Sequence, residues 1–149
     1  MKYYAIQGCP KNDEEAIALC ADKLFQEGCV TDQFSDNCIK RERLYPTGMP
    51  SQLPVAMPHS ESSGVIEDAI CLLILEKPVD FRRIDDDEQQ IHAQMVFNLA
   101  VKDPARHMAV LQNLMKMFYD TETLKTLYNS PLNTLPGQLA ALLDVKVNG

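Results

Sequence analysis

Two short, nearly pure apolar runs place the strongest constraint on how this chain folds. Residues 69–75 and 94–101 have the length of strands, and turn-forming or charged residues flank both of them. A strand that is apolar on both of its faces needs a covering layer on each side. We therefore expect the two runs to form the centre of a sheet with helices packed on both faces.

Helical patterns before and after the two runs would supply these layers. Asn12 and Glu15 match a capping box ahead of a helix that ends at Gly28, and a second helix is expected from about Ser35 to Leu44. Three more helices are expected later in the chain: one from Asp103 and Pro104 with Met108, Leu111, Leu114, Met115 and Phe118 on one face, one at 121–128, and one at 135–143 capped by Thr134.

The segments between these elements are less regular. Residues 45–58 contain four prolines and one glycine, so we expect a shaped loop with a short edge strand at 53–57. Residues 79–84 favour a shorter strand, and the four consecutive acids at 85–88 are more typical of a solvated turn than of a metal site. Together the elements predict an α/β fold with a mixed central β-sheet flanked by helices on both faces, in a single domain spanning residues 1–149.

The composition argues against several classes of protein. A formal net charge of −7 argues against a nucleic-acid partner, because binding to phosphate backbones requires clustered Lys and Arg. Five cysteines without a C-x-x-C pair indicate buried thiols in a reducing compartment, and the irregular Cys and His spacing argues against zinc or another cofactor. Residues 1–10 do not resemble a signal peptide and no segment is long enough to span a bilayer, so we expect a cytoplasmic protein without direct membrane insertion.

His59 is the histidine with the most unusual surroundings. It follows Pro58, whose ring fixes its own φ angle and favours extended geometry at Met57, so the imidazole is presented at a defined angle. A neutral imidazole has one nitrogen with a free lone pair, which can accept a phosphoryl group. From these residues alone, an exposed loop histidine without a function remains the alternative.

The motifs around His59 resemble those of a known family. Residues 41–48 read Arg-Glu-Arg-Leu-Tyr-Pro-Thr-Gly and residues 57–59 read Met-Pro-His, which is similar to the R-E-x-x-x-x-T-G … A-[IM]-P-H signature of fructose/mannitol-type enzyme IIA proteins of the bacterial sugar phosphotransferase system (PTS). Residues 96–103 and Arg106-His107 resemble that family's strand, its K-D turn and a helix with a second active-site histidine. The resemblance runs from about residue 17 to 143.

Two details concern the branch of the family. The Tyr-Pro-Thr-Gly wording of residues 45–48 looks closest to the galactitol-specific branch. Many relatives approach the histidine through a glycine-rich G-N-G-I-A-I-P-H segment, whereas residues 49–59 of this chain read Met-Pro-Ser-Gln-Leu-Pro-Val-Ala-Met-Pro-His. We therefore expect the backbone of this loop to differ from that of those relatives.

The resemblance implies roles for individual residues. His59 would be the phosphorylated histidine, Arg41 would bind the phosphoryl oxygens or orient His59, and His107 would be a neutral donor at the start of its helix. Thr47 and Gly48 would position the phosphoryl group, with Gly48 supplying a φ angle that other residues do not tolerate, and Ser60 and Ser62 would offer hydroxyl donors. The alternatives are a solvent-exposed Arg41, a packed His107 and ordinary loop hydrogen bonding for Ser60.

The resemblance also implies partners. His59 would accept a phosphoryl group from the small phosphocarrier HPr and pass it to a cysteine of enzyme IIB, which serves the membrane component IIC in sugar uptake, with galactitol as the favoured sugar. The first alternative is a regulatory protein of the nitrogen type, which signals by phosphorylation-dependent protein binding. The second is an α/β ligand-binding domain without phosphate chemistry.

Two features near the histidines remain open. The apolar residues that precede His59 form either an exposed collar for partner proteins or part of the core; they are Met49, Pro50, Leu53, Val55 and Met57. His92 matches no active-site position of the family and is expected to be structural or exposed.

Overall fold

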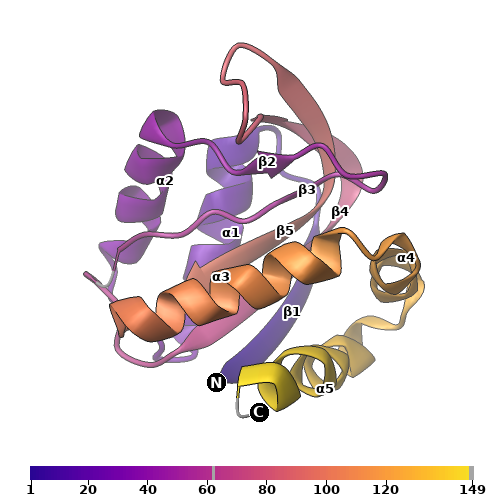
Figure 1. Cartoon of the computed structure of the whole chain (residues 1–149). Helices are drawn as coiled ribbons and strands as arrows, with labels where there is room; N and C mark the ends of the chain where they lie inside the picture. The colour runs from indigo at the N-terminus through magenta and orange to yellow at the C-terminus, as the bar shows by residue number, and fades with distance from the viewer. Residues whose placement is uncertain (62, 148–149) are drawn as a thin grey trace.

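The computed structural model describes residues 1–61 and 63–147 and contains a mixed five-stranded sheet with helices around it (Figure 1). The strands are β1 (Lys2–Gly8), β2 (Gly48–Met49), β3 (Val55–Ala56), β4 (Ala69–Arg82) and β5 (Gln90–Ala100). The helices are α1 (Asp13–Gln26), α2 (Phe34–Leu44), α3 (Pro104–Phe118), α4 (Thr121–Asn129) and α5 (Leu135–Val147), with a 3-10 turn at Leu132–Thr134 before α5. This arrangement confirms the expected α/β class.

The two apolar runs form the middle of the sheet, as expected. The strand order is β1-β4-β5-β3-β2; β4 and β5 pair antiparallel, β1 lies parallel to β4, and β3 lies parallel to β5. The edge strand expected at 53–57 was placed wrongly, because β3 lies inside the sheet and β2 forms the edge. The short segment β3 is therefore held from both sides.

The strands expected at 69–75 and 79–84 are parts of one long strand, β4. Its pairing with β5 shifts register between Ile74 and Val79, and the intervening residues 76–78 are exposed. Pro78 has no N–H to donate to a ladder, so an irregularity at this point lets the strand continue past it. Beyond the shift, β4 and β5 extend as a hairpin that ends in the acidic residues 85–88.

Alternate side chains of β4 and β5 pack into two separate cores, one on each face of the sheet. Ile70, Leu72 and Phe97 pack with α3, α4 and α5, whereas Cys71, Leu73 and Val96 pack with α1 and α2. Figure 1 shows the same division, with α3 and α5 on one side of the sheet and α1 and α2 on the other. The prediction of helices on both faces is confirmed.

The ends of the helices agree closely with the sequence. The Asn12 side chain accepts a hydrogen bond from the Glu15 N–H at 2.9 Å at the start of α1, and Asp103 accepts one from the Ala105 N–H at 2.9 Å at the start of α3. Thr134, which was expected to cap α5, is the last residue of the 3-10 turn that leads directly into this helix. Among the described residues, no helix combines the length and the apolar character needed to cross a bilayer.

The apolar face of α3 is rotated from the expected one. Leu114 and Phe118 are buried as predicted, together with Val110 and Met117, but Met108 is 58% exposed. The predicted stripe therefore runs from the core onto the surface of the protein.

Candidate functional site

His59 lies directly after β3, where the chain runs beside the end of β5. The Pro58 carbonyl accepts hydrogen bonds from the Leu99 N–H at 3.1 Å and from the Asn98 side chain at 2.9 Å. His59 itself forms a bridge with Leu99 and is 6% exposed. The residue is thus fixed to a central strand and is not the exposed loop histidine of the alternative reading.

One nitrogen of the His59 ring is already engaged. Nδ1 lies 2.8 Å from the Met57 carbonyl oxygen, and because a carbonyl only accepts, Nδ1 carries the hydrogen and Nε2 keeps a free lone pair. Burial lowers the pKa of His59 to about 4, with further lowering by Arg41 and His107 and opposition from the hydrogen bond to Met57. The ring is therefore neutral at physiological pH.

His107 faces His59 from the first turns of α3. The two ring centroids are 5.0 Å apart at an interplanar angle of 88°. Burial and the nearby charge of Arg41 lower the pKa of His107, and its Nε2 is buried without a hydrogen-bond partner among the described residues. A neutral imidazole with an unused buried nitrogen beside His59 is suited to bind an incoming oxygen.

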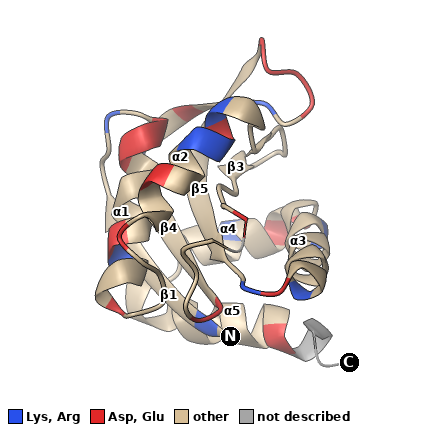
Figure 2. Cartoon of the chain, turned by 90° about the vertical axis from the view of Figure 1, so that its left-hand side faces the viewer, with Lys and Arg blue, Asp and Glu red and all other residues tan. Residues whose placement is uncertain are grey.

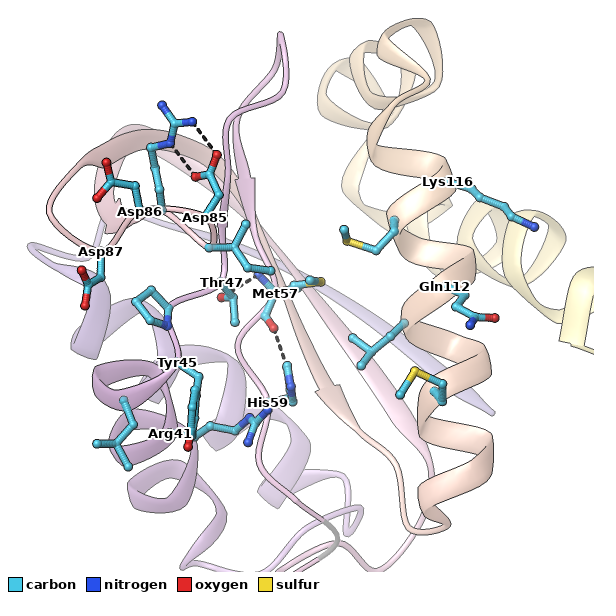
Figure 3. Close-up of a pocket in the computed structure, with 17 residues that line it drawn as sticks. Arg41, Tyr45, Thr47, Met57, His59, Asp85, Asp86, Asp87, Gln112 and Lys116 are labelled. Atoms are coloured by element: carbon cyan, nitrogen blue, oxygen red, sulfur yellow. Dashed lines mark hydrogen bonds and ion pairs between the residues drawn. The ribbon is translucent and has the colours of Figure 1, made fainter.

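Arg41 reaches the same place from the last turn of α2. Its guanidinium lies 5.2 Å from the Tyr45 ring centroid, and one of its nitrogens lies 3.8 Å from the exposed carboxylate of Glu61. Its Nε is buried without a hydrogen-bond partner among the described residues. Figure 3 shows the Arg41 side chain extending toward His59, so the fold brings together the three residues expected to act on a phosphoryl group.

The residues expected to position the phosphoryl group differ in their hydrogen-bond partners. Thr47 is buried; its N–H and hydroxyl donate to Glu42 at 2.8 Å each, and its Oγ1 accepts from the Met57 N–H at 3.1 Å. The Ser60 hydroxyl donates to the Glu61 carbonyl at 2.8 Å, within its own loop. Thr47 therefore acts on the backbone before His59, and the role of Ser60 stays a prediction, while Ser62 lies outside the described residues.

The reason given for Gly48 was wrong. Among the described residues, positive φ angles occur at Gly28 and Gly64 and not at Gly48. A Cβ atom at Gly48 would instead lie 2.5 Å from the Arg82 carbonyl oxygen. Glycine is needed here because β2 passes closely against the backbone of β4.

Two residues that sequence reasoning gave no role contribute to the site. Asn98 is fully buried and holds the Pro58 carbonyl, and Glu42 is 5% exposed and accepts both hydrogen bonds from Thr47. Burial raises the pKa of Glu42 to about 7, against the lowering effect of its hydrogen bonds from Thr47. The signal for Asn98 was present, since a lone amide in an apolar strand needs a partner.

A cavity of about 890 Å³ opens beside His59 (Figure 3). Its walls come from the end of α2, the β4–β5 hairpin and α3, and its apolar lining includes Leu44, Tyr45, Met108, Leu111 and Met115. At its rim, Leu44 is 72% exposed and Met108 is largely exposed. The cavity is much larger than a phosphoryl group and offers an apolar surface next to the histidine.

The residues considered for an exposed collar pack inward instead. Met49, Leu53, Val55 and Met57 are all buried in the core on the α3 side of the sheet, while Pro50 is exposed. The exposed apolar rim is formed by other residues, from α2 and α3.

Among the remaining candidate groups, Cys38 lies next to the His59 segment, because its sulfur is 3.6 Å from the Asn98 amide nitrogen that holds the Pro58 carbonyl. His92 was expected to be structural or exposed, and it is exposed on the β4–β5 hairpin. Its Nδ1 lies 2.5 Å from a carboxylate oxygen of Asp80. Cys20, Cys29, Cys38 and Cys71 are buried free thiols, but Cys9 is exposed, contrary to the expectation. The part of the chain that the structure describes contains no group of three His, Cys, Asp or Glu side chains able to hold a metal ion.

Comparison with known proteins gives a consistent result. Residues 5–133 match the family described as "Phosphoenolpyruvate-dependent sugar phosphotransferase system, EIIA 2". The galactitol-specific EIIA component of Escherichia coli K12 is 29% identical over 118 residues, which cover 78% of each chain.

Two solved structures share the fold. The complex of enzyme IIAMTL and phosphorylated enzyme IIBMTL from E. coli superposes with a TM-score of 0.70 at 20% identity, covering 97% of this chain and 94% of that chain. The crystal structure of IIA mannitol from E. coli superposes with a TM-score of 0.69 at 22% identity, covering 95% of each.

Proposed function

The chain belongs to the EIIA 2 family of the phosphoenolpyruvate-dependent sugar phosphotransferase system, and from this premise we propose that His59 carries the phosphoryl group on Nε2. Proteins of this family are phosphotransferase components that relay phosphoryl groups in sugar uptake. The observation that carries the assignment is the neutral ring of His59, whose Nδ1–H is bound to the Met57 carbonyl and whose Nε2 is free.

The proposed transfer needs only the side chains of this cluster. The Nε2 lone pair of His59 attacks phosphorus in line with the N–P bond of phosphorylated HPr; a new N–P bond forms, and the old bond breaks with its electrons returning to the HPr histidine. The ring gains positive charge, which the Nδ1–H bond to Met57 stabilises. Arg41 and His107 supply positive charge and a hydrogen bond to the phosphoryl oxygens.

In the second half of the cycle the acceptor is a thiolate. A cysteine of enzyme IIB attacks the phosphoryl group, an S–P bond forms, and the electrons of the N–P bond return to Nε2 of His59. Enzyme IIB then serves the membrane component IIC. Residues 1–149 act as one EIIA domain in the cytoplasm, where HPr and the donor phosphoenolpyruvate are found.

Labelling tests the assignment directly. After incubation with enzyme I, HPr and labelled phosphoenolpyruvate, the protein is expected to carry one acid-labile, base-stable phosphoryl group, which mass spectrometry locates on His59. The His59→Ala variant is expected to remain unlabelled while folding normally. Label on the variant, or on another residue of the unchanged protein, would remove His59 from its role.

The sugar and the downstream partner need a second experiment. The 29% identity to the galactitol-specific component and the Tyr-Pro-Thr-Gly wording at 45–48 favour galactitol. Restoration of galactitol uptake in cells that lack their own galactitol EIIA, with the cognate IIB and IIC present, is the expected outcome. If the protein does not restore uptake, and its removal from its own host changes regulation and leaves sugar uptake intact, the nitrogen-type regulatory function is favoured.

A further inference from the structure

A line of hydrogen bonds runs from a buried carboxylate on α2 to the His59 ring. Glu42 accepts from the Thr47 hydroxyl at 2.8 Å, Thr47 Oγ1 accepts from the Met57 N–H at 3.1 Å, and the Met57 carbonyl accepts from His59 Nδ1 at 2.8 Å. Figure 3 shows the last two of these contacts in sequence. Glu42 and Thr47 are both positions of the R-E-x-x-x-x-T-G motif, and the hydrogen bond between them shows how these two positions are connected in the fold.

We propose that Glu42 is a positioning residue for the transfer, which acts through Thr47 and the Met57 peptide to hold His59 in the tautomer with a free Nε2. The inference rests on the proposed function of His59 and adds a residue to it. Glu42 touches neither the phosphoryl group nor the His59 ring, so its effect must appear in the orientation of that ring.

The chemistry of Glu42 sets the direction of the first two hydrogen bonds. Above its pKa of about 7, Glu42 is an ionised carboxylate that only accepts, so the Thr47 hydroxyl then points its hydrogen toward Glu42. The lone pairs of Thr47 Oγ1 are then available to the Met57 N–H. Because Thr47 also donates its own N–H to the other carboxylate oxygen at 2.8 Å, both oxygens of Glu42 bind this one residue.

The backbone that these bonds hold lies just beyond the short strand β3. Residues 50–54 and 57–58 lie outside the strands, and β3 is only two residues long. Asn98 and Leu99 hold the Pro58 carbonyl, which fixes the chain after Met57, while Thr47 fixes the Met57 peptide itself. The carbonyl that receives His59 Nδ1 is therefore oriented from both sides, and Glu42 anchors one of them.

The charges near Glu42 leave Thr47 as its main partner. The charge of Asp13 on α1 raises the pKa of Glu42, and the charge of Arg82 on β4 lowers it. Arg43 and Glu14 lie at the same small cavity and form an ion pair with each other. Arg82 donates to the backbone carbonyls of Glu42 and Arg43 and not to the carboxylate. Among the described residues, the Glu42 carboxylate forms no ion pair, so its charge, when the group is ionised, acts mainly on Thr47.

The test uses two pairs of variants with matched shapes. Thr47→Val removes the hydroxyl and keeps the volume, while Thr47→Ser restores the hydroxyl; Glu42→Gln keeps the shape and removes one acceptor. The control is Glu14→Gln, which neutralises a carboxylate on the neighbouring helix α1 that pairs with Arg43 outside this line of hydrogen bonds. Two quantities are measured: the ¹⁵N shifts of the His59 ring in unphosphorylated protein, and the rate of phosphoryl acceptance from phosphorylated HPr.

The unchanged protein, Thr47→Ser and Glu14→Gln are expected to show one tautomer with the hydrogen on Nδ1. Glu42→Gln and Thr47→Val are expected to show mixed tautomers and acceptance slowed about tenfold, as for loss of orientation of a reacting group. A single Nδ1–H tautomer in both variants would overturn the proposal, even if transfer slowed, because the slowing would then have another origin. Since the ring shifts are read without phosphate, failure of the proposed function would show separately, as absence of label on His59.

Discussion

The two sides of the cavity beside His59 are built in opposite ways. Residues 55–59 are buried, as are Glu42 and Thr47, and the hydrogen bonds of this side reach partners about 40 residues away, as between Asn98 and Pro58. The tip of the β4–β5 hairpin, residues 83–90, is largely exposed, and its ion pairs join near neighbours, such as Arg83 with Asp85 at 2.7 Å. The strands that lead to the tip contribute Val79, Phe81 and Ile91 to the core. Figure 2 shows the acidic tip of this hairpin standing clear of the rest of the protein.

This difference separates two tasks. The buried side fixes the direction of the reacting ring, where a small displacement is costly, while the exposed tip of the hairpin contributes charge that a partner meets in water. Substitutions on the buried side should therefore change stability or the rate of transfer, and substitutions at the tip should change neither by much. The following predictions test that separation, beginning with the largest expected effect.

Two histidines offer the sharpest contrast. His107→Ala removes a half-buried ring that faces His59, and transfer from phosphorylated HPr is expected to slow about 100-fold, as for loss of a donor to developing charge. His92→Ala removes the exposed hairpin histidine and is expected to leave the rate unchanged. Both rates are measured by rapid quench with labelled HPr, and similar rates for the two variants would break the comparison.

The buried ring of His59 should also make stability depend on pH. Its folded pKa of about 4 lies below the ordinary 6.5, so below pH 6.5 the unfolded chain binds a proton that the folded protein does not. Stability is thus fully present above pH 6.5 and falls as the pH drops toward 4, by about 3 kcal/mol in all. Urea unfolding at several pH values should show a shallower fall for His59→Gln; identical slopes would contradict the low pKa.

Gly48 and Gly137 form a matched pair for packing. A Cβ at Gly48 meets the Arg82 carbonyl oxygen at 2.5 Å, so Gly48→Ala is expected to destabilise the protein by about 2 kcal/mol. A Cβ at Gly137 in α5 meets nothing within 4 Å, and Gly137→Ala should stabilise it by about 0.5 kcal/mol through helix propensity. Urea unfolding measures both, and a neutral Gly48→Ala would show that β2 can move away from β4.

The smallest effect is expected at the acidic tip. Replacing Asp85, Asp86 and Asp87 together by Asn should leave the midpoint of thermal unfolding unchanged, because exposed pairs contribute little to stability. The rate at saturating HPr should also be unchanged, while the salt dependence of association becomes different. A loss of stability as large as that of Gly48→Ala would show that the tip of the hairpin is part of the structural support of the site.

Much of this organisation could be predicted from the sequence. The apolar runs predicted the central strands, Asn12 and Asp103 predicted the starts of α1 and α3, and the Met-Pro-His motif singled out the histidine that the fold buries between α2 and α3. These signals are local, since each depends on a few neighbouring residues. Motif resemblance added Arg41 and His107, which lie far apart in the chain and meet at the site.

The features that could not be predicted depend on long-range contacts. Nothing near Gly48 in sequence reveals that Arg82 passes 2.5 Å from where its Cβ would lie. Two separate strands were expected at 69–75 and 79–84, and only the irregular pairing with β5 lets β4 continue through Pro78. The hydrogen bonds of Glu42 likewise depend on a loop whose path the prolines restrict but do not specify.

The double hold on the Pro58 carbonyl has a consequence for how the protein becomes active during synthesis. Asn98 and Leu99, which supply both hydrogen bonds, follow Pro58 by about forty residues, so a ribosome must complete β5 before the segment around His59 can settle. His107 on α3 arrives later still. A nascent or partly folded chain therefore contains His59 but does not hold it in the orientation for transfer. The protein becomes able to transfer a phosphoryl group only after the sheet has formed.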